Sequence, residues 1–138
     1  MKVLNCILCE DIIRDVETDR VTIINTIEEI NAIGFPLFLQ KLCCFVSLDK
    51  EGIDIQSFDG KLIIKNNDKT LVDMSAKIVF LEKPRARVMI KLAGIPIYEP
   101  GILVVEMLES EKIFLNYNIP INQPKQAGQA FVSAEPKE

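Results

Sequence analysis

Four cysteines are the residues of this sequence best suited to metal binding or redox chemistry, and they stand at positions 6, 9, 43 and 44. The Cys6-x-x-Cys9 spacing is one that zinc and redox sites use. The residues around it form an apolar run typical of a β-strand, on which positions three apart point to opposite faces. Because the adjacent Cys43 and Cys44 diverge in the same way, we expect four reduced thiols that pack as small apolar side chains and hold no metal.

Acid–base chemistry has few candidates, because histidine is absent from all 138 residues. Its absence removes the imidazole bases of Ser-His and Cys-His catalysis and any His-ligated metal. A glycoside hydrolase instead needs two carboxylates on opposite sides of a bound sugar. The candidate carboxylates stand in turns beside other charges and are Glu10, Asp11, Glu28, Glu29 and Glu99. We expect no catalytic residue and no cofactor. A small-ligand-binding, carbohydrate-binding or hydrolytic domain that uses these surface carboxylates is the alternative.

A basic stripe is a further candidate site. Of the four bases Lys83, Arg85, Arg87 and Lys91, the last three fall on one face of a predicted strand. No aromatic residue lies on that face and the formal net charge is −4, so we expect no nucleic-acid ligand. One interpretation of the stripe is a solubilising outer face. The other is pairing with the acidic segment 10–19 of another copy.

The segment 33–39 is the most apolar of the predicted loops. Loops are normally solvated, so an apolar one needs a cover. Phe35, Leu37 and Phe38 either fold back as a plug that closes one end of the domain, or partly remain outside as a contact for a partner protein or a second subunit. We expect the plug for at least one of the two phenylalanines, and a weak homodimer formed elsewhere through sheet edges.

The elements that must position these residues are strands. With 49% hydrophobic and 26% charged residues the composition is that of a globular domain. Apolar, β-branched runs recur about every ten residues, separated by turn residues. They cover residues 3–9, 20–27, 40–48, 53–58, 61–65, 71–81, 86–92, 102–108 and 112–121. The pair Asp59-Gly60 between two runs predicts a hairpin turn, segment 10–19 an acidic connection and segment 28–39 a long loop.

This pattern predicts an all-β protein, an antiparallel β-sandwich of about eight or nine strands, with a barrel as the second choice. Alternation within 76–80 and 86–92 predicts one buried and one wetter face. The residues expected in the core are Ile78, Phe80, Val88, Ile90, Leu92, Leu103, Val105, Ile113 and Leu115.

We expect a single domain over residues 1–121, followed by a polar tail over 122–138 that is mobile and dispensable to folding. The apolar run after Lys2 is too short for a signal peptide, and no stretch approaches the ~20 apolar residues of a membrane helix. We therefore expect a cytoplasmic protein without membrane contact.

Several short motifs carry a family resemblance. They are Cys9-Glu10-Asp11 at the end of the first run, the strand start Arg20-Val21-Thr22-Ile23-Ile24, the loop pair Phe35-Pro36, the strand 42–48 and the late segment 92–101. Over about residues 1–121 the chain resembles a small family of uncharacterised bacterial domains. The resemblance implies an immunoglobulin-like β-sandwich with no assigned activity. Such domains often carry Tyr two residues after the Pro-Gly pair, where this chain has Leu103, so no tyrosine corner is expected.

Taken together, the residues and the resemblance predict a non-catalytic protein-binding or assembly module. Its expected partner is an unidentified protein or a second copy of the chain. The residues expected to make that contact are Phe35, Leu37, Phe38, Arg85, Arg87 and Lys91.

Overall fold

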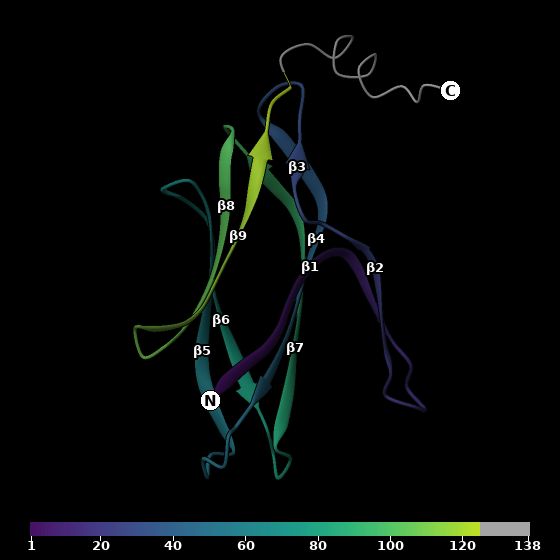
Figure 1. Cartoon of the computed structure of the whole chain (residues 1–138), viewed down its shortest axis with the longest axis vertical. Coiled ribbons are helices and arrows are strands. Elements are labelled where there is room, and N and C mark those ends of the chain that lie inside the picture. The colour runs from purple at the N-terminus through teal and green to yellow at the C-terminus, as the bar shows by residue number, and fades with distance from the viewer. Residues whose placement is uncertain (125–138) are drawn as a thin grey trace, which may run out of the picture.

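The computed structural model describes residues 1–124, which form nine strands and no helix (Figure 1). The strands are β1 (Lys2–Arg14), β2 (Val21–Thr26), β3 (Ile30–Asn31), β4 (Leu37–Asp49), β5 (Ser57–Asn66), β6 (Lys69–Val79), β7 (Arg85–Ile97), β8 (Gly101–Glu109) and β9 (Lys112–Asn122). The prediction of an all-β protein is confirmed. Over the described range no helix has the length and apolar character needed to cross a membrane.

The strands form two sheets that lie as two layers in Figure 1. The first sheet has the order β2-β1-β4-β7 and is antiparallel throughout. The second has the order β3-β9-β8-β5-β6 and is mixed, because β3 runs parallel to β9 with Ile30 opposite Ile121. The prediction of a purely antiparallel structure is therefore wrong at β3. This two-residue strand lies in the segment predicted as a loop, and burial of Ile30 in the main core holds it there.

One main core lies between the layers, and both sheets contribute fully buried side chains to it. They include Leu42, Val46 and Leu48 from the first sheet and Leu62, Ile64, Leu103, Val105 and Met107 from the second. Of the residues predicted in the core, six are buried: Ile78, Phe80, Ile90, Leu103, Val105 and Leu115. Val88 and Leu92 are half-buried against the same core.

Ile113 was predicted in the core and is 48% exposed. The pairing of β8 with β9 shifts register here, because Met107 opposes Leu115 whereas Leu108 opposes Ile113. The extra residue, Phe114, forms a bulge that turns Ile113 to the outer face. Phe114 takes the inward place instead, with its ring edge-on to that of Phe58 at a centroid separation of 5.9 Å.

The predicted hairpin at Asp59-Gly60 is also wrong, because both residues lie inside β5. Position 60 takes glycine because close packing leaves no room for a side chain. A Cβ atom there would lie 2.7 Å from Cδ1 of Ile78 and 2.9 Å from the carbonyl oxygen of Ala76. This glycine marks a close approach between neighbouring strands, which is a common role of glycine within a sheet. The 53–58 and 61–65 runs therefore merge into one strand, which begins at Ser57.

Buried Asn66 ties the β5–β6 hairpin to the connection between β7 and β8. Its side-chain oxygen accepts hydrogen bonds from the N–H groups of Tyr98 (2.8 Å) and Glu99 (3.0 Å), and its amide donates to the carbonyl of Glu99 (3.1 Å). The side-chain oxygen of Asn67 accepts from the N–H of Ile102 at 2.9 Å. Because β7 belongs to one sheet and β5 to the other, these bonds connect the two sheets at this end.

The last strand and the residue after it contact the segment around β3. Asn122 is the last residue of β9, and its side-chain amide donates to Glu29 (2.8 Å) and Asn31 (3.1 Å). The side chain of Gln123 donates to the carbonyl of Ile33 at 3.0 Å. The mobility predicted for the tail concerns mainly residues 125–138, which lie outside the described range.

Candidate functional site

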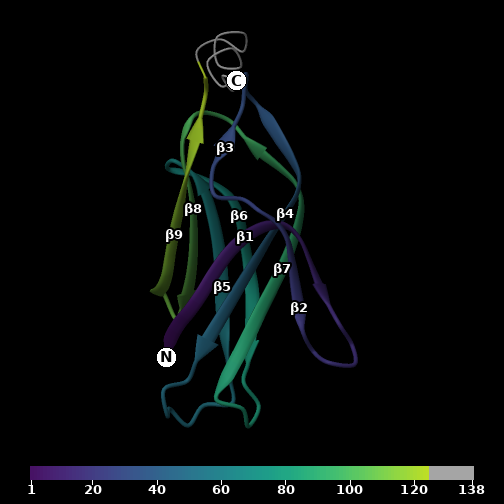
Figure 2. The same cartoon turned by 45° about the vertical axis from the view of Figure 1, so that its right-hand side comes forward.

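The candidate site is built by a hairpin arm that leaves the body of the first sheet. Residues 2–9 of β1 pair with β4, whereas residues 9–14 pair with β2, so the predicted acidic connection is strand as far as Arg14. We call residues 10–26 the acidic arm. Figure 2 shows it on the outer side of β4 and β7. A small apolar cluster apart from the main core holds it there, made of Cys9, Ile12, Cys43, Val21, Ile23 and Phe45.

The acidic arm brings carboxylates to the basic stripe of β7. Asp19 accepts a hydrogen bond from Nη1 of Arg14 at 2.8 Å and also pairs with Arg87. Further along the stripe, Asp11 lies 3.2 Å from Nζ of Lys91. One of the two interpretations from the sequence was that the stripe pairs with segment 10–19 of another copy. In the structure, Asp11 and Asp19 of the same chain make these contacts.

Both carboxylates are held in their charged form. The hydrogen bond from Arg14, together with the charge of Arg87, lowers the pKa of Asp19 below its ordinary value. The pKa of Asp11 is lowered first by the N–H of Ile12 and then by the ammonium group of Lys91. Asp19 therefore stays ionised at neutral pH, as a carboxylate held between two guanidinium groups.

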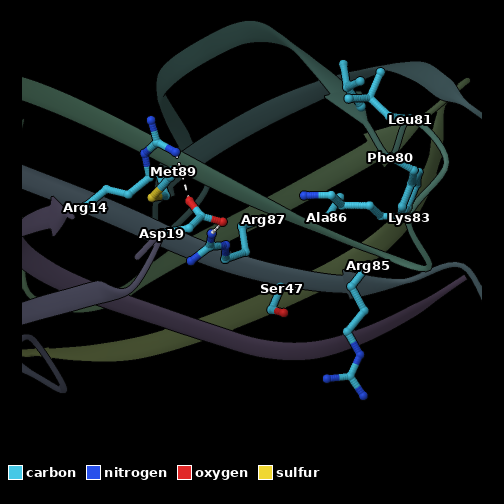
Figure 3. A pocket seen from close by; sticks show the side chains of 11 residues that line it. Arg14, Asp19, Ser47, Phe80, Leu81, Lys83, Arg85, Ala86, Arg87 and Met89 are labelled. Atoms are coloured by element: carbon cyan, nitrogen blue, oxygen red, sulfur yellow. Dashed lines mark hydrogen bonds and ion pairs between the residues drawn. The ribbon is translucent and has the colours of Figure 1, made fainter. Parts of the chain in front are cut away.

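Arg14, Asp19 and Arg87 line a surface cavity of about 480 Å³, which we call the basic hollow (Figure 3). Its lining consists of Arg14, Asp19, Ser47, Val79, Phe80, Leu81, Lys83, Arg85, Ala86, Arg87 and Met89. Four of these side chains are cationic and one is anionic. In Figure 3 Arg14 and Arg87 converge on Asp19, whereas the guanidinium of Arg85 points away from it. Arg85 pairs with Asp49 at 3.6 Å.

The arrangement suits an anionic ligand. A guanidinium group presents its N–H donors as a planar fork that matches a carboxylate or a phosphate. Two of the predicted contact residues, Arg85 and Arg87, line the hollow, while Lys91 lies outside it with Asp11. Sequence reasoning missed Arg14 and Asp19. The available signal was that Arg14 is the one base within the acidic segment 10–19.

The apolar segment 33–39 divides between the two predicted roles. Phe35 and Leu37 are half-buried and pack against the main core, as the plug interpretation expects. Phe38 is 62% exposed, opposite Pro96 of β7, and lines a separate surface cavity together with Leu39. The difference follows from strand geometry, because β4 begins at Leu37 and successive side chains of a strand point to opposite faces. Leu37 and Leu39 therefore point inward and Phe38 points outward.

The four thiols form two pairs on opposite sides of the β1–β4 ladder. Cys9 lies directly opposite Cys43 in the small cluster, while Cys6 and Cys44 lie on the side of the main core, as strand geometry predicts. Burial raises the pKa of Cys9 and of Cys43, and the hydrogen bond with Cys6 raises that of Cys44. All four thiols are free. Among residues 1–124 no three side chains of Cys, Asp or Glu gather in a way that would hold a metal ion.

Two of the candidate carboxylates, Glu10 and Asp11, line the surface cavity that also contains Phe38 and Leu39, and three of the five make local hydrogen bonds. Glu10 accepts from the amide of Asn25 at 2.6 Å, and Glu29 accepts from Asn122 at 2.8 Å. Glu99 accepts from Asn67 at 2.6 Å, within the corner described above. These contacts account for three of the five carboxylates named from the sequence.

Comparison with known proteins gives limited information. No protein-family model and no curated protein matches the chain. Among solved structures, a β-glucosidase from Listeria innocua in complex with isofagomine aligns at a TM-score of 0.43 and 13% identity, over 68% of this chain and 14% of the enzyme. The same enzyme in complex with glucose aligns at 0.44 and 16%, over 69% of this chain and 15% of the enzyme. Likenesses this distant carry no argument about activity.

Proposed function

We propose that this protein is a non-catalytic binding module that takes an acidic segment of a partner protein in the basic hollow. The observation that carries the proposal is the Asp19 carboxylate held between Arg14 and Arg87. In this contact two guanidinium groups of the hollow bind a carboxylate of the same chain, and a carboxylate is the group that an acidic segment supplies. Lys83 and Arg85 line the same cavity. Lys83 makes no ion pair within residues 1–124 and offers its charge to the remaining groups of an acidic segment, whereas Arg85 must exchange its contact with Asp49 to do so.

The charge distribution supports an acidic partner. The whole chain carries a formal charge of −4, so a hollow with four cations and one carboxylate is opposite in sign to the molecule around it. Local fields of this kind steer oppositely charged partners to a surface and exclude like-charged ones.

A protein segment fits the hollow better than a nucleic acid. Proteins that bind single-stranded nucleic acids stack the bases on accessible aromatic rings. The aromatic residue in this lining is Phe80, which is fully buried in the core and offers no face to a base.

We also propose that the two sheets form an immunoglobulin-like sandwich, as the family resemblance implies. Strand order supports this: without β2 and β3, the sheets read β1-β4-β7 and β9-β8-β5-β6. If these seven strands are numbered in chain order, the first, second and fifth (β1, β4 and β7) lie in one sheet. The seventh, sixth and third (β9, β8 and β5) lie side by side in the other, as in the immunoglobulin fold. The fourth, β6, lies beside β5 in the second sheet.

The proposal is tested with a fluorescent peptide that alternates Glu and Val, measured by anisotropy against the full chain. We expect saturable binding that weakens with salt, and none for the Lys–Val analogue. Each rim charge contributes about 0.5–1 kcal/mol, so the double variant Lys83→Gln/Arg85→Gln should bind about 5- to 30-fold more weakly.

The matched control is Lys2→Gln/Lys112→Gln, which changes the net charge equally at two exposed lysines outside the hollow. We expect it to bind the peptide within about twofold of the parent chain. Equal weakening in both double variants, or no binding of the Glu–Val peptide by the parent chain, would show that the hollow is not the receptor.

A further inference from the structure

A second surface cavity, of about 530 Å³, runs between two strands that end their respective sheets. We call it the seam. One wall is β6 and the other is β7, and its lining is Met74, Ser75, Ala76, Lys77, Ile78, Val79, Arg87, Val88, Met89, Ile90 and Lys91. β6 pairs only with β5 and β7 only with β4 among the described strands, so each presents an unpaired edge.

The seam continues the basic hollow. Val79, Arg87 and Met89 line both cavities, so the two form one path along β7. The seam lining contains three cations, Lys77, Arg87 and Lys91, and no carboxylate. Arg87 and Lys91 pair with Asp19 and Asp11 of the acidic arm, and Lys77 makes no ion pair within residues 1–124. A ligand that binds the hollow through acidic groups therefore meets further cations when it extends into the seam.

The backbone of β7 offers hydrogen bonds along this path. β7 pairs regularly with β4 from Arg85 to Leu92 on one side. On the other side every second residue directs its N–H and C=O groups away from β4, as any strand at the end of a sheet does. An extended peptide laid on such an edge gains main-chain hydrogen bonds, while alternate side chains select its sequence.

We propose that the acidic partner segment binds by adding a strand to the free edge of β7, within the seam. This inference rests on the proposed function and names its mode. On β7 the outward residues are Arg85, Arg87, Met89 and Lys91, and the inward ones are Ala86, Val88, Ile90 and Leu92. The added strand follows the same alternation, so its acidic residues lie beside the outward cations and its apolar residues point between the sheets.

Charge favours an acidic segment over a second copy as the occupant. On β7, Arg85, Arg87 and Lys91 each pair with a carboxylate of the same chain, namely Asp49, Asp19 and Asp11. The lining cations that make no ion pair within residues 1–124 are Lys77 of the seam and Lys83 of the basic hollow, and an acidic segment supplies the opposite charge to both. Two exposed methionines in the lining, Met74 and Met89, supply flexible apolar contact that tolerates different partner side chains.

The test uses the Glu–Val peptide with N-methyl groups on the backbone nitrogens of either all its Glu or all its Val residues. In an added strand the N–H groups that face β7 belong to one of these classes. We expect methylation of that class to weaken binding at least tenfold and methylation of the other to change it less than about threefold. Equal effects of the two methylations overturn strand addition. If unmethylated binding still depends on Lys83 and Arg85, the proposed function stands.

A second measurement needs no variant of either molecule. Hydrogen exchange followed by NMR on the full chain should show peptide-induced slowing at alternate amides of β7, with no such pattern in β9. Uniform or absent slowing in β7 overturns the proposal. So does displacement of the peptide by a single-stranded oligothymidine at lower concentration, or light scattering that shows a dimer whose β7 amides are already protected without peptide. Absence of peptide binding overturns both this inference and the proposed function.

Discussion

Replacing Asn66 by alanine should cost this domain a large part of its stability. The side chain makes three hydrogen bonds, two accepted from the N–H groups of Tyr98 and Glu99 and one donated to the carbonyl of Glu99. A typical intramolecular hydrogen bond contributes a net ~1 kcal/mol. The partner groups belong to the exposed residues Tyr98 and Glu99, so the loss is reckoned from the three hydrogen bonds alone. The expected loss is about 2–4 kcal/mol.

Urea and thermal unfolding followed by circular dichroism measure this loss. With an unfolding entropy of about 2 cal/mol/K per residue, a loss of 3 kcal/mol lowers the Tm by ~10 °C, with an unchanged urea m-value. The control is Asn116→Ala, at an exposed asparagine of β9, where we expect a change within about 0.5 kcal/mol. A loss below about 1 kcal/mol for Asn66→Ala, or the same loss in both variants, would refute the role given to this corner.

Three further expectations concern burial and charge. Ile90→Ala should destabilise the domain by about 2–5 kcal/mol in urea unfolding, and Ile113→Ala by less than about 1 kcal/mol, because the bulge turns Ile113 outward; similar losses would place the bulge elsewhere. Phe38→Asp should leave the melting temperature nearly unchanged whereas Phe35→Asp lowers it strongly, since only Phe35 packs on the core; the reverse order would restore the plug role of Phe38. The lowered pKa of Asp19 means that its ion pairs stabilise the acidic arm above its unfolded pKa of about 4 and are lost as pH falls through the folded value. Amide exchange in the arm should accordingly accelerate in acid in the parent chain and show no such step in Asp19→Asn.

Strand content was predictable because it follows from local chemistry. Runs rich in valine, isoleucine and threonine favour extended backbone wherever they occur. The alternation at 86–92 gave the correct inward face of β7, with Ile90 buried and Arg87 outward. This part of the candidate site needed no tertiary information, since side chains on a strand alternate by geometry alone.

Features that depend on one added or omitted residue were not predictable. The bulge at Phe114 reverses the face of Ile113, and nothing in the local run signals where the ladder gains a residue. The pair Asp59-Gly60 is typical of a turn but lies in a strand. Glycine is required at position 60 because the side chain of Ile78 leaves no room for a Cβ atom. In both cases the decisive contact comes from another strand.

The sequence by itself determined that this chain folds as strands, that its thiols lie on diverging faces and that a basic stripe lines one face of β7. Only the tertiary structure decided what meets that stripe. The acidic arm folds back on its own sheet, so that Asp19 reaches Arg87, which stands 68 residues further along the chain. Likewise, the seam between β6 and β7 exists because two sheet edges lie side by side. Local propensity acts over a few residues, whereas contacts between distant segments follow from how the sheets pack, and that packing depends on the buried core as a whole.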